Sequence, residues 1–107
     1  MTNPSGFGIY AAVKAAIIAL SRTAAMEWGA DGIRVNTLIP LAMSDAMVGW
    51  SKADPVGFGR VVDETALKRV GDCERDIGPA VVFLAGSDAS YITGTILTVD
   101  GGQMRLG

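Results

Sequence analysis

Histidine is absent from this sequence of 107 residues, and cysteine occurs once. Without histidine the chain lacks the base of Ser/His and Cys/His nucleophiles and the usual zinc ligand, so we expect no metal site. The single Cys73 cannot form a disulfide within the chain, which favours a reducing, cytoplasmic location. Any chemistry therefore depends on tyrosine, lysine, serine or carboxylate side chains, or on a bound cofactor.

A strong charge of one sign is missing as well. The formal net charge is −2, which gives no reason to expect nucleic acid or an anionic membrane as a partner. The longest apolar run, residues 11–20, is interrupted by Lys14 and is shorter than the roughly 20 residues that span a bilayer. No cationic segment precedes this run, as a secretory signal would require. The sequence therefore predicts no nucleic-acid partner and no membrane partner.

Small and apolar residues are abundant: half of the sequence is hydrophobic, and there are 14 glycines. Periodicity predicts a helix over residues 9–28, a buried strand over 33–39, a helix over 77–84 and a strand over 95–99. Helix, strand, long crossover with helix, strand is half of a doubly wound, Rossmann-like parallel sheet. We therefore expect an α/β fold in which residues 1–107 form a single partial domain with two adjacent parallel strands.

The stretch from residue 41 to residue 71 is less regular. Apolar residues at positions 43, 46, 47 and 50 suggest one short amphipathic helix, and Pro55 with two nearby glycines is expected to break the chain after it. A long excursion after the carboxyl end of a parallel strand is where α/β proteins place substrate loops. We therefore interpret residues 41–71 as a short helical substrate lobe.

Charged residues in and after this lobe have two interpretations. Arg60, Lys68 and Arg69 could bind an anion, but scattered surface cations are the more common pattern. Acidic residues at positions 72, 74 and 76 precede the predicted second helix, where they complement the helix dipole; a carboxylate metal site is the less favoured alternative.

Tyr10 and Lys14 are four residues apart, so on a helix they lie on one face, one turn apart. A nearby ammonium favours a phenolate and lowers the pKa of a tyrosine, which suits it for general acid–base work. The same spacing also arises when an aromatic packing contact lies beside a solvated lysine, and by itself that is the more common case. The rest of the chain decides between the two.

Residues 6–11 match the dinucleotide-binding pattern G-x-G-x-x-A, but the physics of that motif is not met. The motif needs a strand directly before it, so that the turn presents a helix N-terminus to the pyrophosphate. Only five residues precede Gly6, and Pro4 is one of them. We reject this match.

An ordered set of short motifs extends over nearly the whole chain. The motifs are Tyr10-x-x-x-Lys14 with Ala15-Ala16, Gly32–Asn36 with Pro40, Arg69–Gly71, Asp76–Ile77, Phe83–Ala85, Ile92–Gly94 and Val99–Gly102. In this order and at these spacings they resemble the short-chain dehydrogenase/reductases. The resemblance implies an oxidoreductase that interconverts carbonyl and alcohol groups of a small-molecule substrate with NAD or NADP as cofactor.

The resemblance also implies roles for individual residues. Tyr10 would be the catalytic acid and base, and Lys14 would lower the pKa of Tyr10 and bind the nicotinamide ribose. The segment from Pro40 to Ser44 would lie along the nicotinamide, so Pro40, Met43 and Ser44 join Tyr10 and Lys14 as expected cofactor-binding residues. Here the sequence departs from the family pattern, because Leu41 replaces the glycine that normally follows the proline.

Other family features have no counterpart in these 107 residues. The family's catalytic serine lies about a dozen residues before the tyrosine, and its glycine-rich cofactor turn precedes that serine. The chain thus resembles only the C-terminal portion of such an enzyme, and we expect it to be inactive alone and to bind NAD(P) poorly. The alternative is a non-catalytic, truncated chain that serves as an oligomerisation or interaction module.

Homo-oligomerisation is expected on either interpretation. Two strands are too few for a stable sheet, and the open edge of strand 33–39 invites pairing with another chain. The predicted first helix is apolar almost all round in its first half, so it needs cover on more than one side. We expect a homo-oligomer, most simply a two-fold dimer.

Overall fold

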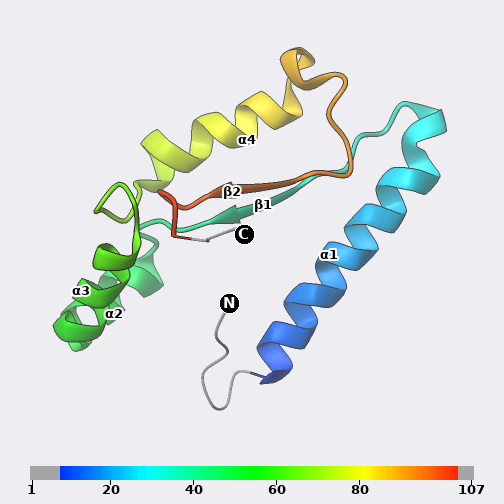
Figure 1. Cartoon of the computed structure of the whole chain (residues 1–107). Coiled ribbons are helices and arrows are strands. Elements are labelled where there is room, and N and C mark those ends of the chain that lie inside the picture. Colours follow the sequence, from blue (N-terminus) through cyan, green and yellow to red (C-terminus); the bar gives the residue numbers. More distant parts are fainter. Residues whose placement is uncertain (1–7, 104–107) are drawn as a thin grey trace.

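The computed structural model describes residues 8–103. Its elements are, in chain order, α1 (Gly8–Trp28), the 3₁₀ turn η1 (Gly29–Asp31), β1 (Thr37–Pro40), α2 (Asp45–Ala53), α3 (Pro55–Glu64), the π turn η2 (Cys73–Ile77), α4 (Gly78–Ala85), the 3₁₀ turn η3 (Ser87–Ala89) and β2 (Ile96–Val99). Figure 1 shows α4 along the two strands, the lobe helices α2 and α3 beyond one end of them, and α1 apart from the lobe.

The two strands are adjacent and parallel, which confirms the predicted α/β fold and strand pairing. Thr37 pairs with Ile96, and the register continues to Pro40 and Val99. Proline has no N–H to donate, and Pro40 occupies the last position of β1, where the strand ends. Because the strands are parallel, both have their carboxyl ends on the side of the lobe (Figure 1). The carboxyl ends of parallel strands are where α/β proteins usually bind ligands.

β1 is shorter than the strand predicted over residues 33–39, because side chains replace ladder bonds before Thr37. The Asn36 amide group donates to Ile92 O and accepts from Thr95 N, at 3.0 and 3.1 Å. The Val35 N–H donates to the Thr93 hydroxyl at 3.0 Å. These residues hold the incoming chain in line with β2 without forming a regular strand.

α1 runs from Gly8 to Trp28, close to the helix predicted over residues 9–28. Gly29 follows its last residue, as predicted, and begins the tighter turn η1. Gly32 then adopts a left-handed conformation at φ 77° and its N–H bonds to Gly29 O, which turns the chain toward β1.

The lobe contains two helices, so the prediction that Pro55 and the nearby glycines prevent a second helix was wrong. Pro55 is the first residue of α3, a position that needs no N–H. Asp54 accepts a hydrogen bond from Gly57 N at 3.0 Å and so caps the helix. A Cβ at Gly57 would collide with the Asp54 carboxylate, which explains one of the two glycines. Trp50 of α2 packs edge-on against Phe58 of α3, with ring centroids 6.1 Å apart.

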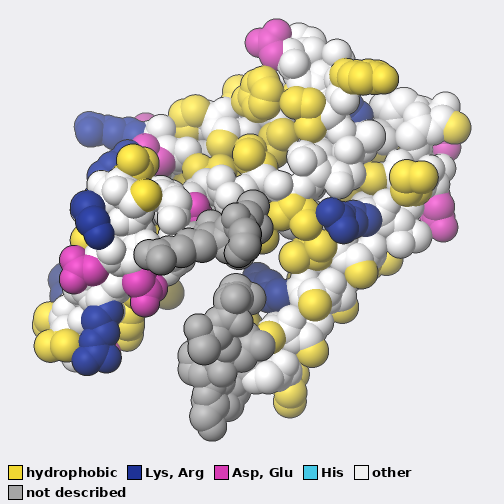
Figure 2. Space-filling view, viewed as in Figure 1, with side chains coloured by type: hydrophobic (Ala, Val, Ile, Leu, Met, Phe, Trp, Pro, Cys, Tyr) yellow, Lys and Arg dark blue, Asp and Glu magenta, His cyan; other side chains and the backbone are white. Residues whose placement is uncertain are grey.

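Few side chains are buried in the part of the chain that the structure describes. Ala25, Thr65, Ala89 and Asp100 are the buried ones. The radius of gyration is 15.7 Å, whereas a compact domain of this length has about 13 Å. Figure 2 shows hydrophobic side chains gathered over α4 and along α1. The chain by itself therefore leaves much of its apolar surface uncovered.

α1 carries the largest share of this exposed surface. Ile9, Leu20 and Met26 are 84%, 70% and 85% exposed, and Ala25 is the only buried residue of the helix. The cover on several sides that its composition requires is not supplied by residues 8–103.

By length and composition alone, the 24 residues Gly8–Asp31 could cross a membrane, with a mean hydropathy of 1.4. The full helix is longer than the run of residues 11–20 that we expected to be too short. Buried core helices of soluble proteins and signal sequences pass the same test, so length and composition alone do not assign this helix to a membrane.

Candidate functional site

Tyr10 and Lys14 lie in the first two turns of α1, on one face of the helix, as their spacing predicts. The Lys14 ammonium nitrogen is 5.3 Å from the centroid of the Tyr10 ring, within the range of a cation–π contact. The Tyr10 side chain is 59% exposed. The structure therefore brings the two expected catalytic residues together and leaves them accessible to a partner or a ligand.

The segment from Pro40 to Ser44 leaves the carboxyl end of β1 and enters the lobe. The Met43 N–H donates to Gly71 O at 2.8 Å, so backbone pairing fixes this residue. The Ser44 oxygen accepts from Met47 N at 3.2 Å and caps α2. Its hydroxyl hydrogen remains available to donate, and Pro40 and Ser44 are both exposed.

The two sets of expected site residues come from different elements. Tyr10 and Lys14 are near the N-terminal end of α1, and Pro40–Ser44 follow β1 (Figure 1). Within residues 8–103, α1 makes its main contacts with the adjacent turn η1. The structure thus forms each half of the expected site separately.

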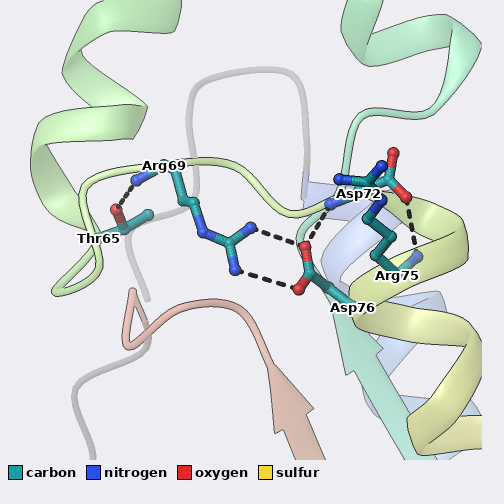
Figure 3. Close-up of polar contacts among 5 residues, drawn as sticks. All are labelled: Thr65, Arg69, Asp72, Arg75 and Asp76. Carbon is teal, nitrogen blue, oxygen red and sulfur yellow. Dashed lines mark hydrogen bonds and ion pairs between the residues drawn. The ribbon is translucent and has the colours of Figure 1, made fainter.

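Sequence reasoning missed a polar cluster at the exit of the lobe, which we call the Arg69–Asp76 cluster; it comprises Thr65, Arg69, Asp72, Arg75 and Asp76 (Figure 3). The Arg69 guanidinium donates to both Asp76 oxygens, at 2.7 and 3.1 Å. Asp76 also accepts from the Asp72 N–H at 2.7 Å, and Asp72 accepts from the Arg75 N–H at 2.8 Å. Arg69, expected to be a scattered surface cation, is instead half of a bidentate ion pair.

The cluster changes the ionisation of its members. The hydrogen bond from the Arg69 guanidinium, helped by the Asp72 N–H, lowers the pKa of Asp76 from its ordinary 3.8 to about 2. The same pair raises the pKa of Arg69. A spacing of seven residues between arginine and aspartate was the available signal, but it identifies a pair only when the intervening chain turns back.

Two hollows lie beside the sheet. One, of about 130 Å³, is at the carboxyl ends of the strands and is lined by Leu41, Gly71, Val99 and the Arg69–Asp76 pair, among others. The other, of about 440 Å³, lies between β1 and α4 and includes Arg34 and Asn36. Neither is lined by Tyr10 or Lys14.

The described residues contain no group of side chains that could bind a metal ion. Among residues 8–103, no group of three or more carboxylate or thiol side chains is placed to hold an ion. Two of the three acids, Asp72 and Asp76, instead belong to the Arg69–Asp76 cluster, where Asp72 caps η2.

Comparison with known proteins identifies the class. A family model described as Enoyl-(Acyl carrier protein) reductase matches residues 2–104. The 12alpha-hydroxysteroid dehydrogenase of a Clostridium species is 41% identical over 94 residues, which cover 88% of this chain and 36% of the relative. These matches give the chain a family of proteins with a Rossmann-type fold.

Solved structures agree. The hydroxysteroid dehydrogenase of Escherichia coli is 34% identical with a TM-score of 0.83, and the match covers 94% of this chain and 41% of that one. A 4-hydroxyisoleucine dehydrogenase complexed with NADH is 27% identical with a TM-score of 0.77, and the match covers 89% of this chain and 39% of that one.

The chain belongs to the short-chain dehydrogenase/reductase family. This confirms the family resemblance that its motifs indicated. The chain spans little more than a third of the length of the curated relatives it matches.

Proposed function

We propose that this chain supplies the proton-transfer part of an NAD(P)-dependent interconversion of carbonyl and alcohol groups. Tyr10 is the acid and base, and Lys14 is its cationic partner. The observation that carries the proposal is the Lys14 ammonium held 5.3 Å from the Tyr10 ring, one turn away, in a chain of this family. The names of the relatives, two hydroxysteroid dehydrogenases among them, support the reaction class.

The proton step follows from the chemistry of these two side chains. During reduction the Tyr10 hydroxyl gives its proton to the carbonyl oxygen of the substrate, and during oxidation the phenolate takes it back. The Lys14 ammonium stabilises the negative oxygen that this leaves. When bound, NAD(P)H would supply the hydride for reduction, and NAD(P)⁺ would accept it in oxidation.

The residues present fit the nicotinamide end of such a cofactor. Lys14 is exposed and carries ammonium hydrogens for a ribose hydroxyl, and the Ser44 hydroxyl hydrogen and the exposed face of Pro40 are available beside Met43. Within residues 8–103, no glycine-rich turn leads from a strand into a helix to hold the phosphates. We therefore expect this chain alone to bind NAD(H) or NADP(H) no better than about millimolar.

The test uses a chimera in which this chain replaces the part of the E. coli hydroxysteroid dehydrogenase to which it is similar. Tyr10→Phe is expected to lower the rate of carbonyl reduction about 10²–10⁴-fold and to leave the Kd for NAD(P)H nearly unchanged. Tyr91→Phe is the matched control, because Tyr91 is fully exposed in the loop before β2. An unchanged rate in the Tyr10 variant would refute the proposal.

A second candidate function is an interaction module, in which the chain docks onto another subunit without catalysing a reaction. The exposed apolar side chains of α1 favour it. Co-expression with a full-length family member, followed by pull-down, tests this candidate. Loss of capture in a variant with Leu20→Lys, with Leu67→Lys in the lobe as control, is the expected result.

A further inference from the structure

The Arg69–Asp76 pair closes a short loop around Gly71. Arg69 stands two residues before Gly71, and the Asp76 carboxylate bonds both to the Arg69 guanidinium and to the N–H of Asp72, the residue after Gly71. Figure 3 shows the carboxylate between the two segments. The Asp76 carboxylate therefore holds the backbone N–H directly after Gly71 and the side chain of the residue two positions before it.

Gly71 in turn holds the segment that enters the lobe. Its N–H donates to Leu41 O at 3.2 Å, and its carbonyl accepts from Met43 N at 2.8 Å, which forms a parallel bridge with Ala42. A Cβ at Gly71 would come within 3.1 Å of Leu41 O and 3.3 Å of the Asp76 side chain. Gly71 is therefore packed closely between the Arg69–Asp76 cluster and the segment that follows β1.

The cluster is anchored on its other side as well. The Arg69 N–H donates to the hydroxyl of the fully buried Thr65 at 3.1 Å. The Leu67 N–H donates to Gly101 O, in the turn after β2, at 3.0 Å. A displacement of Arg69 or Asp76 is therefore passed to Gly71 rather than absorbed by a loose loop.

We infer that Arg69 and Asp76 are positioning residues for the segment Pro40–Ser44, on which they act through Gly71. This rests on the proposed function, which places the nicotinamide end of the cofactor against that segment. The bidentate geometry carries the effect, since an exposed ion pair contributes little by charge alone.

Hydrogen exchange in this chain tests the positioning step without cofactor or activity. In Arg69→Met, the amides of Met43 and Gly71 are expected to exchange about tenfold faster, and the amide of Gly94, at the opposite end of the strands, at its original rate. Arg60→Met removes a guanidinium from the same lobe and is expected to change none of the three.

Conservative variants separate geometry from folding. Arg69→Lys keeps the charge but not the fork, and Asp76→Asn keeps an acceptor oxygen; both are expected to give a smaller acceleration at Met43 and Gly71. Unchanged exchange at these two amides in Arg69→Met, or an equal acceleration at Gly94, would overturn the inference, because the pair would then have no role or a merely general one.

The chimera with the E. coli hydroxysteroid dehydrogenase tests the link to the cofactor. There, Arg69→Met is expected to raise the KM for NAD(P)H about tenfold, with a smaller change in kcat. Faster exchange at Met43 with an unchanged KM would overturn the cofactor step of the inference, even if Tyr10→Phe still abolishes the reaction. Failure of the Tyr10 test with faster exchange would instead refute the proposed function and leave the coupling through Gly71 standing.

Discussion

The two glycines after β2 are required by the backbone conformation at their positions, not by a need for flexibility. Gly101 and Gly102 have φ of 63° and 84°, in the left-handed region that disfavours a side chain. The Gly102 N–H bonds to the Asp100 carboxylate at 3.0 Å, and a Cβ at Gly102 would lie 2.7 Å from that of Ala66. The Asp-Gly-Gly run thus closes the end of the sheet against the lobe.

Gly102→Ala is therefore expected to lower the free energy of unfolding by at least about 1–2 kcal/mol, the usual cost of a left-handed conformation for a residue with a Cβ. Gly59→Ala is the control, because Gly59 is inside α3 with open space around it. That control is expected to stabilise the chain by about 0.5–1 kcal/mol. Urea unfolding measures both; a neutral Gly102→Ala would contradict the account of this turn.

At the scale of elements, the lobe depends on its helix caps. Asp54→Ala removes the acceptor for Gly57 N and is expected to destabilise α3 by about 0.5–2 kcal/mol. Asp54→Asn keeps an equivalent acceptor and is expected to restore most of this loss. Near-equal urea midpoints for the alanine variant and the original chain would show that the cap is not needed.

The Arg69–Asp76 pair is expected to make the free energy of unfolding depend on pH in the acidic range. Because the folded state lowers the pKa of Asp76 from 3.8 to about 2, its contribution is complete above the ordinary value and is lost as the pH falls from about 4 to about 2. Asp76→Asn is expected to flatten the urea midpoint across this window. Asp88→Asn, in η3 and outside the cluster, is expected to keep the original slope; equal slopes for all three proteins would contradict the assignment.

Patterns local to one element predicted best. The periodicity of α1 and the β-branched residues of β2 located both elements to within about a residue, because each is dictated by neighbours along the chain. α3 was missed because proline at a first helical position is permissive, and only the Asp54 cap distinguishes that from a break. The predicted β1 was too long, since Asn36 and Val35 form side-chain bonds that periodicity does not encode.

The candidate site divides in the same way. The shared face of Tyr10 and Lys14 followed from helix geometry alone. The Arg69–Asp76 pair did not, because it depends on how Gly71 docks on Leu41, a contact between segments some 30 residues apart.

At the scale of the whole molecule, exposed apolar surface predicts association. Each large apolar side chain left in water forgoes about 1.5–3 kcal/mol, and a domain is stable by only about 5–15 kcal/mol. We expect a two-fold dimer that covers α1. Light scattering at micromolar concentration checks this, with Ile17→Glu expected to shift the chain toward monomer and Val56→Glu, on α3, expected not to. A compact, cooperatively melting monomer would refute it.

The parallel pairing of β1 with β2 also has a consequence for the order in which the chain is made. The residues that pair between the two strands, such as Thr37 and Ile96, are 59 positions apart, so a large loop closes before any ladder bond forms. At about 5–20 residues per second, a ribosome completes α1 roughly 4–14 s before it completes β2. β1 cannot pair with β2 throughout that interval, so the ladder between these two strands is a late event in folding.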